Sequence, residues 1–181
     1  MKPPITWNLL EACRRPAEEC LARTNWHELC LRASRHNDQE CVVLEQVATG
    51  LNHVVRLLEF QDCTRWVVRI PIAHVEKEHP ARSFGLRAEV DILSLLGEKT
   101  SIVPRIFDYE LTAENPVGVP FILMEFLPGD TAMDSLGGWE SHLGAIPHTY
   151  RYGFYSSVAK MQVGLTITSH YASSLLTSAC R

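Results

Sequence analysis

Two charged side chains in apolar surroundings are the strongest candidates for chemistry in this chain. Arg69 lies in the strand-like run WVVRIP, and Glu89 shares one face of a helix-like stretch with Leu86 and Leu93. Burying either charge alone is costly, so we expect the two side chains to pair where the strand meets the helix. The alternative is that Arg69 is a solvated edge residue and Glu89 faces water.

A paired arginine at this position would still be able to bind a phosphate. A guanidinium group carries five N–H donors, so it can meet a carboxylate and keep donors for a second anion. Side chains alternate along a strand, which places Val67 on the same face as Arg69. An apolar side chain there would cover an adenine ring.

Two further segments suit a nucleotide, although each also has an ordinary structural explanation. Gly50 ends a strand-like run in VATGLNHV, where a glycine permits positive φ or close approach of the backbone to a ligand. A simple hairpin turn would explain it equally well. The apolar run FILMEFLPG places Glu125, Phe126 and Leu127 before a Pro-Gly turn, and its backbone offers hydrogen bonds to a base. The alternative is a buried strand that ends in a turn.

These residues must be positioned by a sheet and its helices. The predicted elements, in order, are two helices within 6–35, strands at 41–50, 53–60 and 65–72, a helix at 82–97, strands at 106–111 and 120–127, and helices at 131–136 and 149–165. Asn25 and Glu28 are spaced as a capping box for the second helix. Short turns between the first three strands indicate an antiparallel meander. The fold class is therefore α+β, with a five-stranded antiparallel sheet and one helix, preceded by two helices and followed by a helical region.

Composition excludes several classes of protein. The net charge is −4 and the pI is about 6.0, which argues against a nucleic-acid partner. No secretory signal is evident, and no apolar run approaches the roughly 20 residues that cross a bilayer. The six cysteines form no C-x-x-C pair, so we expect reduced thiols and no zinc site. These features predict a cytoplasmic protein without a membrane partner.

The wording and order of the motifs resemble a known family. The runs GLNHVVRLLEFQDCTRWVVRIPI, SFGLRAEVDILSLL, VPRIFDYELTAENPVGVPFILMEFLPG and FYSSVAKMQVGL are similar to the N-terminal lobe and first C-lobe helix of the aminoglycoside phosphotransferase family, in its fungal branch. That family has a protein-kinase-like fold and holds ATP and magnesium between two lobes. The resemblance implies a nucleotide-loop turn at Gly50 and Asn52, a phosphate-binding cation at Arg69 with its partner Glu89, an apolar contact at Val67, and a hinge formed by Met124, Glu125, Phe126 and Leu127.

The same resemblance implies that the chain lacks the family's chemistry. No Asp follows Asp134 and no Asn follows Asn115, so the catalytic Asp and the magnesium ligands of the family have no counterpart. We therefore expect no catalytic or metal-binding residue, weak or vestigial ATP binding, and magnesium only in a full-length parent enzyme. The alternative is a non-catalytic module that binds a nucleotide, or a protein partner through exposed surface. The expected divisions are a helical lead-in at 1–38, an N-lobe at 39–128, a hinge and the start of a C-lobe at 129–165, and a divergent tail at 166–181.

Overall fold

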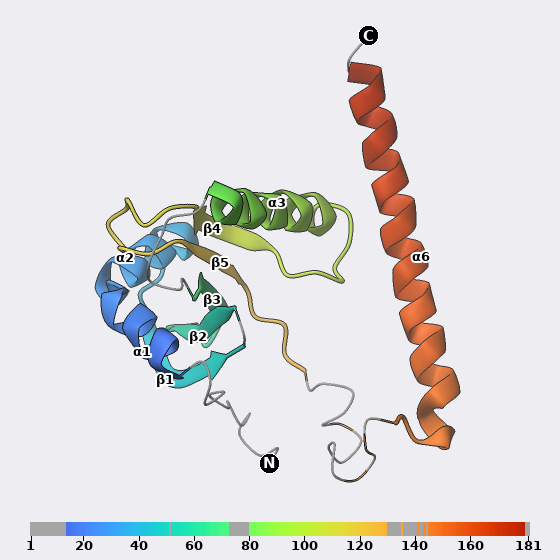
Figure 1. Cartoon of the computed structure of the whole chain (residues 1–181), viewed down its shortest axis with the longest axis horizontal. Helices are drawn as coiled ribbons and strands as arrows, with labels where there is room; N and C mark the ends of the chain where they lie inside the picture. The colour runs from blue at the N-terminus through green and yellow to red at the C-terminus, as the bar shows by residue number, and fades with distance from the viewer. Residues whose placement is uncertain are drawn as a thin grey trace. The chain divides into compact units, whose positions relative to one another are not determined.

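The protein has an α+β fold, as the sequence predicts. The computed structural model describes residues 14–50, 52–72, 80–129, 135, 141, 143 and 145–179, with side chains for all of these except 14, 80–84 and 167–179. The elements are α1 (Arg14–Arg23), α2 (Trp26–Asn37), β1 (Cys41–Thr49), β2 (His53–Phe60), β3 (Arg65–Pro71), α3 (Pro80–Gly97), β4 (Ile106–Glu110), β5 (Phe121–Glu125) and α6 (His148–Ala179) (Figure 1). The order of the elements along the chain agrees with the prediction: two helices precede the first strand, one helix lies between β3 and β4, and a helix follows β5.

The chain divides into two compact units. The first contains Met1–Gly97 and Val103–Phe126, and the second contains Glu98–Ile102 and Leu127–Arg181. All five strands belong to the first unit, together with α1, α2 and α3. The candidate chemistry around Arg69 therefore depends on the first unit.

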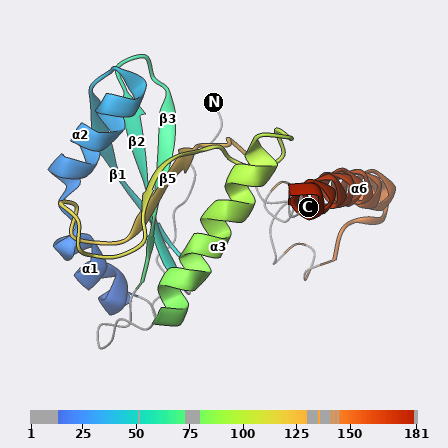
Figure 2. The same ribbon diagram turned by 90° about the horizontal axis from the view of Figure 1, so that it is seen from above.

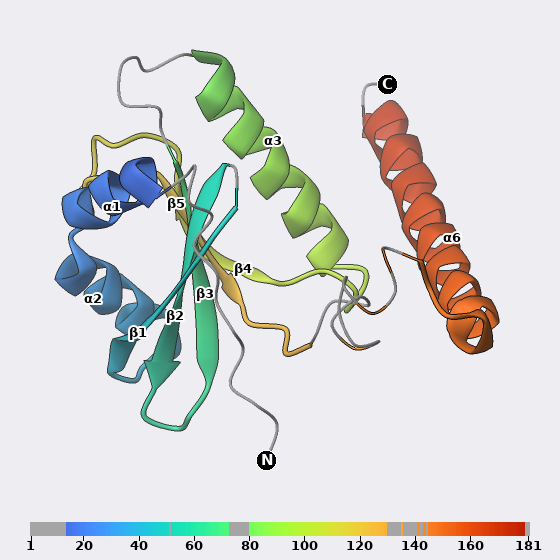
Figure 3. The ribbon, with the colours of Figure 1, turned by 60° about the horizontal axis from the view of Figure 1, so that its bottom comes forward.

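All neighbouring strands in the sheet are antiparallel, in the order β1-β2-β3-β5-β4. The predicted meander of β1, β2 and β3 is confirmed (Figure 3). An irregularity interrupts β1 between Val43 and Val47. Arg56 of β2 donates from Nε and Nη2 to the Leu44 carbonyl at 3.1 and 2.6 Å, which satisfies a group that the bulge removes from the ladder.

Helices α1 and α2 cover one face of the sheet and α3 covers the other (Figure 2). The face under α1 and α2 holds the larger core, and alternate residues of β2 and β3 point into it. Its fully buried side chains include Leu29 of α2, Leu58 of β2 and Phe121 of β5. Trp66 stacks on Phe107 in the same layer, with ring centroids 3.7 Å apart.

The face under α3 holds a smaller apolar cluster. Leu86 and Val90 of α3 pack on Ile122 and Met124 of β5, with Val67 at the margin. Leu86 and Val90 are four residues apart and therefore lie on one side of the helix. This cluster fixes the side of α3 that meets the sheet, and thereby the position of Glu89.

The start of α2 shows half of the predicted capping box. The Asn25 side chain accepts a hydrogen bond from the Glu28 amide at 3.2 Å, as expected. The reciprocal bond is replaced, because the Asn25 amide donates to the Val117 carbonyl at 2.8 Å. Gly118, next to Val117, has φ of 81° and closes the Asn115 turn. The cap therefore joins α2 to the loop before β5.

Helix α6 is longer than the sequence predicts. A helix was expected over 149–165, whereas α6 spans His148–Ala179 and includes most of the predicted divergent tail. Residues 166–179 contain neither Pro nor Gly, so nothing in that stretch ends the helix. Within the described part of the chain, no helix has the length and apolarity required to cross a bilayer. The helix expected at 131–136 falls largely outside the described residues.

Candidate functional site

The predicted pair of Arg69 and Glu89 is present. The Arg69 Nη1 group bonds the Glu89 carboxylate, so the cation of β3 and the acid of α3 meet between the sheet and the helix. The two side chains are 31% and 29% exposed. Because each keeps nearly a third of its surface in water, the pair lies at the margin of the small core and is open to solvent.

His53 is a third member of this cluster, and we did not predict it. The Arg69 Nη2 group donates to His53 Nδ1 at 3.1 Å, which requires a neutral imidazole with its proton on Nε2. Burial, followed by the nearby Arg69 charge, lowers the pKa of His53 from its usual value, while Glu89 opposes the shift. The sequence contains a signal for this contact, since a hairpin between β2 and β3 brings His53 beside Pro71, two residues from Arg69.

The guanidinium of Arg69 keeps donors that these two bonds do not use. Among the described residues, its Nε has no hydrogen-bond partner. Val67 lies on the same face, two residues earlier in β3, and is half-buried against Met124. This face of the sheet therefore presents the Arg69 guanidinium, which keeps an unused donor, beside the apolar surface of Val67 and Met124.

The turn that contains Gly50 and Asn52 lies at the end of the sheet beyond Arg69. The Gly50 amide donates to the His53 carbonyl at 3.0 Å, and the Asn52 carbonyl accepts from the Ile72 amide at 2.8 Å. Gly50 does not have positive φ, and an added Cβ would meet nothing within 4 Å. The backbone at Gly50 is thus open, although the conformation does not itself demand glycine.

The predicted hinge lies at the other end of β3. Met124 pairs with Val67, and Glu125 pairs with Trp66. Trp66 is five residues from Pro71 along β3, a distance of about 16 Å. The Glu125 amide already donates to the Arg105 carbonyl at 2.8 Å, and its side chain accepts from the Arg105 amide at 3.2 Å. Phe126, also in the first unit, is half-buried, and Leu127, the first residue of this segment in the second unit, is exposed. The Glu125 N–H is therefore already engaged, which removes one of the backbone donors that were expected to bind a base.

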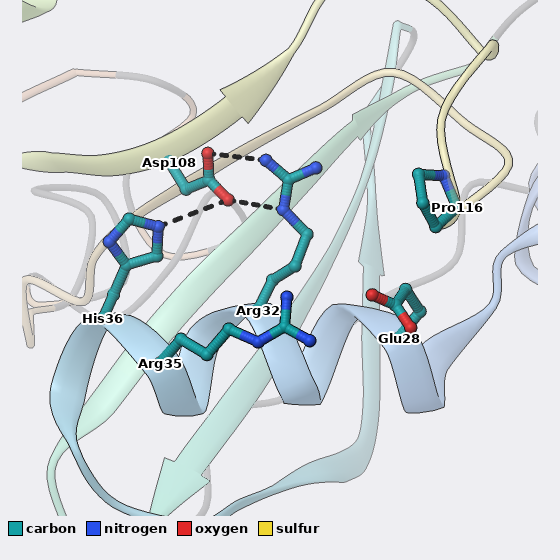
Figure 4. A pocket seen from close by; sticks show the side chains of 6 residues that line it. All are labelled: Glu28, Arg32, Arg35, His36, Asp108 and Pro116. Carbon is teal, nitrogen blue, oxygen red and sulfur yellow. Dashed lines mark hydrogen bonds and ion pairs between the residues drawn. The ribbon is translucent and has the colours of Figure 1, made fainter.

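A second charged cluster joins α2 to β4 (Figure 4). Arg32 donates two hydrogen bonds of 2.7 and 2.9 Å to the Asp108 carboxylate and one of 2.6 Å to Glu110 Oε1. His36 Nε2 lies 3.5 Å from Asp108 Oδ2. These groups border a shallow hollow of about 290 Å³, which is lined by Glu28, Arg32, Arg35, His36, Asp108 and Pro116. Two acids already engage Arg32, so we interpret the cluster as a structural link between helix and sheet.

The sequence carried a signal for this second cluster. Asp108 and Glu110 alternate along β4 and therefore point to one face of the strand. Two carboxylates on a strand face that a helix covers favour a cation opposite them, and Arg32 of α2 supplies one. No group of three or more His, Cys, Asp and Glu side chains capable of holding a metal ion occurs in the described portion.

The chain is similar to yeast proteins named "Altered inheritance of mitochondria protein 9, mitochondrial". It is 30% identical to the Saccharomyces cerevisiae protein over 95 residues, which are 52% of this chain and 15% of that protein. The corresponding values are 31% over 99 residues, 52% and 16% for Candida tropicalis, and 28% over 112 residues, 61% and 18% for Clavispora lusitaniae. The chain thus spans about a sixth of the length of the curated relatives it matches. No family model and no solved structure matches it.

These findings correct four interpretations drawn from the sequence. The relatives are named for mitochondrial inheritance and no phosphotransferase or kinase family or structure matches, so the assignment to the aminoglycoside phosphotransferase family is wrong, and so is the kinase-like function in its active and its pseudokinase-like form. The descriptions of the chain as a transferase and as a kinase-like protein are wrong for the same reason, although the fungal source of the relatives agrees with the prediction. Binding of a nucleotide or of a protein partner is a separate prediction, which these findings do not test. The cytoplasmic location is contradicted by the mitochondrial names.

The physical reason for the wrong family is the low specificity of the pattern. Alternating apolar residues, short turns and an amphipathic helix specify an antiparallel sheet with a helix on it. Many unrelated proteins meet the same requirements, so a fold of this class does not identify a function.

Proposed function

We propose that this chain is part of a mitochondrial protein and binds the phosphate groups of a nucleotide such as ATP at the α3 face of its sheet. The observation that supports the proposal is the state of Arg69. Its guanidinium is held by Glu89 and His53, is nearly one-third exposed, and keeps Nε without a partner among the described residues. A held arginine with spare donors is suited to bind a phosphate oxygen.

The arrangement along β3 gives the ligand a direction. Arg69 lies between the open turn at Gly50 and the apolar pair of Val67 and Met124. Phosphates at Arg69 would therefore place an attached base toward Val67 and leave the far phosphate near Gly50. Because Glu89 adds a negative charge beside Arg69, we expect binding to be weak, with a dissociation constant on the order of 1 mM.

The test is ATP binding by the purified 181-residue chain in EDTA-containing buffer, measured by isothermal titration and by ligand-observed NMR. Arg69→Ala should weaken binding at least about tenfold, which corresponds to about 1.4 kcal/mol. Arg87→Ala is the matched control, because Arg87 is on α3 and pairs with Asp91 four residues away on the helix surface. Equal loss in both variants would indicate a general charge effect, and undetectable binding by the native chain would refute the proposal.

The mitochondrial location in this proposal is supported by the names of the relatives. The natural gene product, tagged at its C-terminus, should colocalise with a mitochondrial marker and be recovered in purified mitochondria. Recovery in the cytosolic fraction alone would contradict it.

A protein partner is a second candidate, supported by exposed apolar side chains on α3. Ile92 and Leu95 are 57% and 38% exposed, although they belong to a helix that packs on the sheet. They are three residues apart and therefore adjacent on the helix surface. If these side chains bind a partner or a second copy, Ile92→Glu with Leu95→Glu should abolish concentration-dependent association in sedimentation velocity. Monomeric behaviour of the native chain at all concentrations would exclude self-association.

A further inference from the structure

We infer that Cys30 and Cys41 form a dithiol site that a peroxide oxidises to an intramolecular disulfide. Cys30 lies in the middle of α2, and Cys41 is the first residue of β1. The site lies on the opposite face of the sheet from Arg69, and it is independent of the proposed nucleotide binding.

The contacts bring the Cys41 sulfur against Cys30. The Cys41 thiol donates to the Cys30 backbone carbonyl at 3.6 Å, and both side chains are half-buried against the same apolar core. The Ser34 hydroxyl, one turn after Cys30, donates to Cys41 Sγ at 3.9 Å. Asp38 ends α2 in the left-handed conformation, which turns the chain back so that β1 starts beside the helix.

A hydrogen bond from Ser34 distinguishes the two cysteines and assigns them different roles. Burial, followed by the neighbouring Cys41, raises the pKa of the Cys30 thiol to about 12. Cys41 is half-buried at the start of the sheet's edge strand, with the Ser34 hydroxyl beside its sulfur. We therefore assign Cys41 as the sulfur that reacts first and Cys30 as the thiol that resolves the product.

The chemistry requires hydrogen peroxide as the oxidant. The Cys41 sulfur attacks one peroxide oxygen, the O–O bond breaks, and Cys41 sulfenic acid and one water form. The Cys30 sulfur then displaces the sulfenic hydroxyl group, which leaves as a second water with the Cys30 proton. Two thiols are oxidised by two electrons and one peroxide is reduced to two waters.

The remaining described cysteines serve as internal controls. Cys20 is buried, its thiol faces the Pro71 carbonyl, and burial raises its pKa to about 11. Cys63 is exposed in the turn between β2 and β3, and no thiol contact involves it within the described ranges. If accessibility alone decided which thiol is oxidised, Cys63 would react first, whereas a neighbouring thiol favours oxidation at Cys41. Oxidation therefore distinguishes the two explanations.

A disulfide here would tie α2 to the bulged edge strand. The two cysteines are 11 residues apart, so the bond closes a short loop and restricts the unfolded chain. We expect the midpoint of thermal unfolding to rise by about 5 °C on oxidation and to return after reduction with dithiothreitol.

The experiment treats the reduced full chain with one equivalent of hydrogen peroxide and analyses it by intact mass and non-reducing peptide mapping. The expected result is a mass loss of about 2 Da, the mass of two hydrogen atoms, and a peptide that joins Cys30 to Cys41. Cys63→Ser should form the same product, and Cys41→Ser should not. Peptide mapping of the native chain does not depend on any variant folding. Alkylatable Cys30 and Cys41 after treatment, or a disulfide that involves another cysteine, would overturn the inference.

Discussion

The two faces of the sheet show how one set of strands supports two kinds of surface. Among the residues whose side chains the structure describes, the face under α1 and α2 contains fifteen buried residues in one cluster, whereas the face under α3 contains four. The charged groups differ as well. Arg32 on the first side is engaged by two carboxylates, and Arg69 on the second side is engaged by one carboxylate and a neutral histidine.

This difference separates stability from binding. Burial of apolar area is the main stabilising contribution in folding, so the α1/α2 face should supply most of the free energy of unfolding. The α3 face has fewer buried contacts and a cation with unused donors. We expect substitutions on the first face to unfold the protein and substitutions on the second to change its ligand binding.

The largest expected effect is the loss of a large side chain from the α1/α2 core. Leu58→Ala should lower the free energy of unfolding by about 4 kcal/mol, because Leu58 is fully buried in the larger cluster. Leu86→Ala, the matched change on the α3 face, should cost about 2 kcal/mol. Urea denaturation followed by circular dichroism measures both. A larger cost for Leu86→Ala would reverse the proposed division between the faces.

The two arginine clusters should differ in the same direction. Arg32→Met leaves Asp108 and Glu110 without their cation in a mostly buried setting, and we expect a loss of about 2 kcal/mol. Arg69→Met should cost about 1 kcal/mol, because water screens the partly exposed pair with Glu89. The same urea titrations give both values, and equal costs would mean that the Arg69 pair is as structural as the Arg32 cluster.

A smaller effect is expected from pH at His53. The pKa of His53 in the folded protein lies below its unfolded value, because burial and Arg69 disfavour the proton. Well above about pH 6.5, neither state binds that proton and the contribution is constant. As the pH falls below this value the unfolded chain is protonated first, so stability decreases until the folded pKa is passed.

The matched variant for this prediction is His53→Asn, which retains an acceptor near the position of Nδ1 but does not titrate. Urea midpoints measured from pH 7.5 to pH 5 should fall more for the native chain than for the variant. Identical slopes would show that His53 does not contribute to the acid sensitivity of the α3 face.

The smallest expected effect is at Gly50. Gly50→Ala should change the free energy of unfolding by less than about 0.5 kcal/mol, because φ is not positive there and the new methyl group meets open space. Gly118→Ala is the contrasting change and should cost about 1–2 kcal/mol, because φ is 81° and the new Cβ would lie 3.1 Å from the Arg23 carbonyl. Thermal unfolding of both variants tests this, and a large loss at Gly50 would indicate that its turn is under strain.

The sequence by itself determined the order of the helices and strands from α1 to β5, the strand meander and the pairing of Arg69 with Glu89, but not the length of α6. These depend on local periodicity and on the cost of burying a lone charge, and both can be evaluated from neighbouring residues. The same information did not reveal that Asn25 would cap α2 while bonding Val117, since that contact joins residues distant in the chain. It also did not identify the protein's relatives, because an antiparallel sheet with a helix on it is a solution that many sequences share.

Only the tertiary structure decided which groups complete each cluster. His53 reaches Arg69 because the register of β2 and β3 sets their spacing, and Arg32 reaches Asp108 and Glu110 because α2 packs beside β4. Cys30 and Cys41 meet because the left-handed residue Asp38 turns the chain between helix and strand. Such contacts depend on where a side chain lies relative to elements far along the chain, and periodicity within one element does not contain that information.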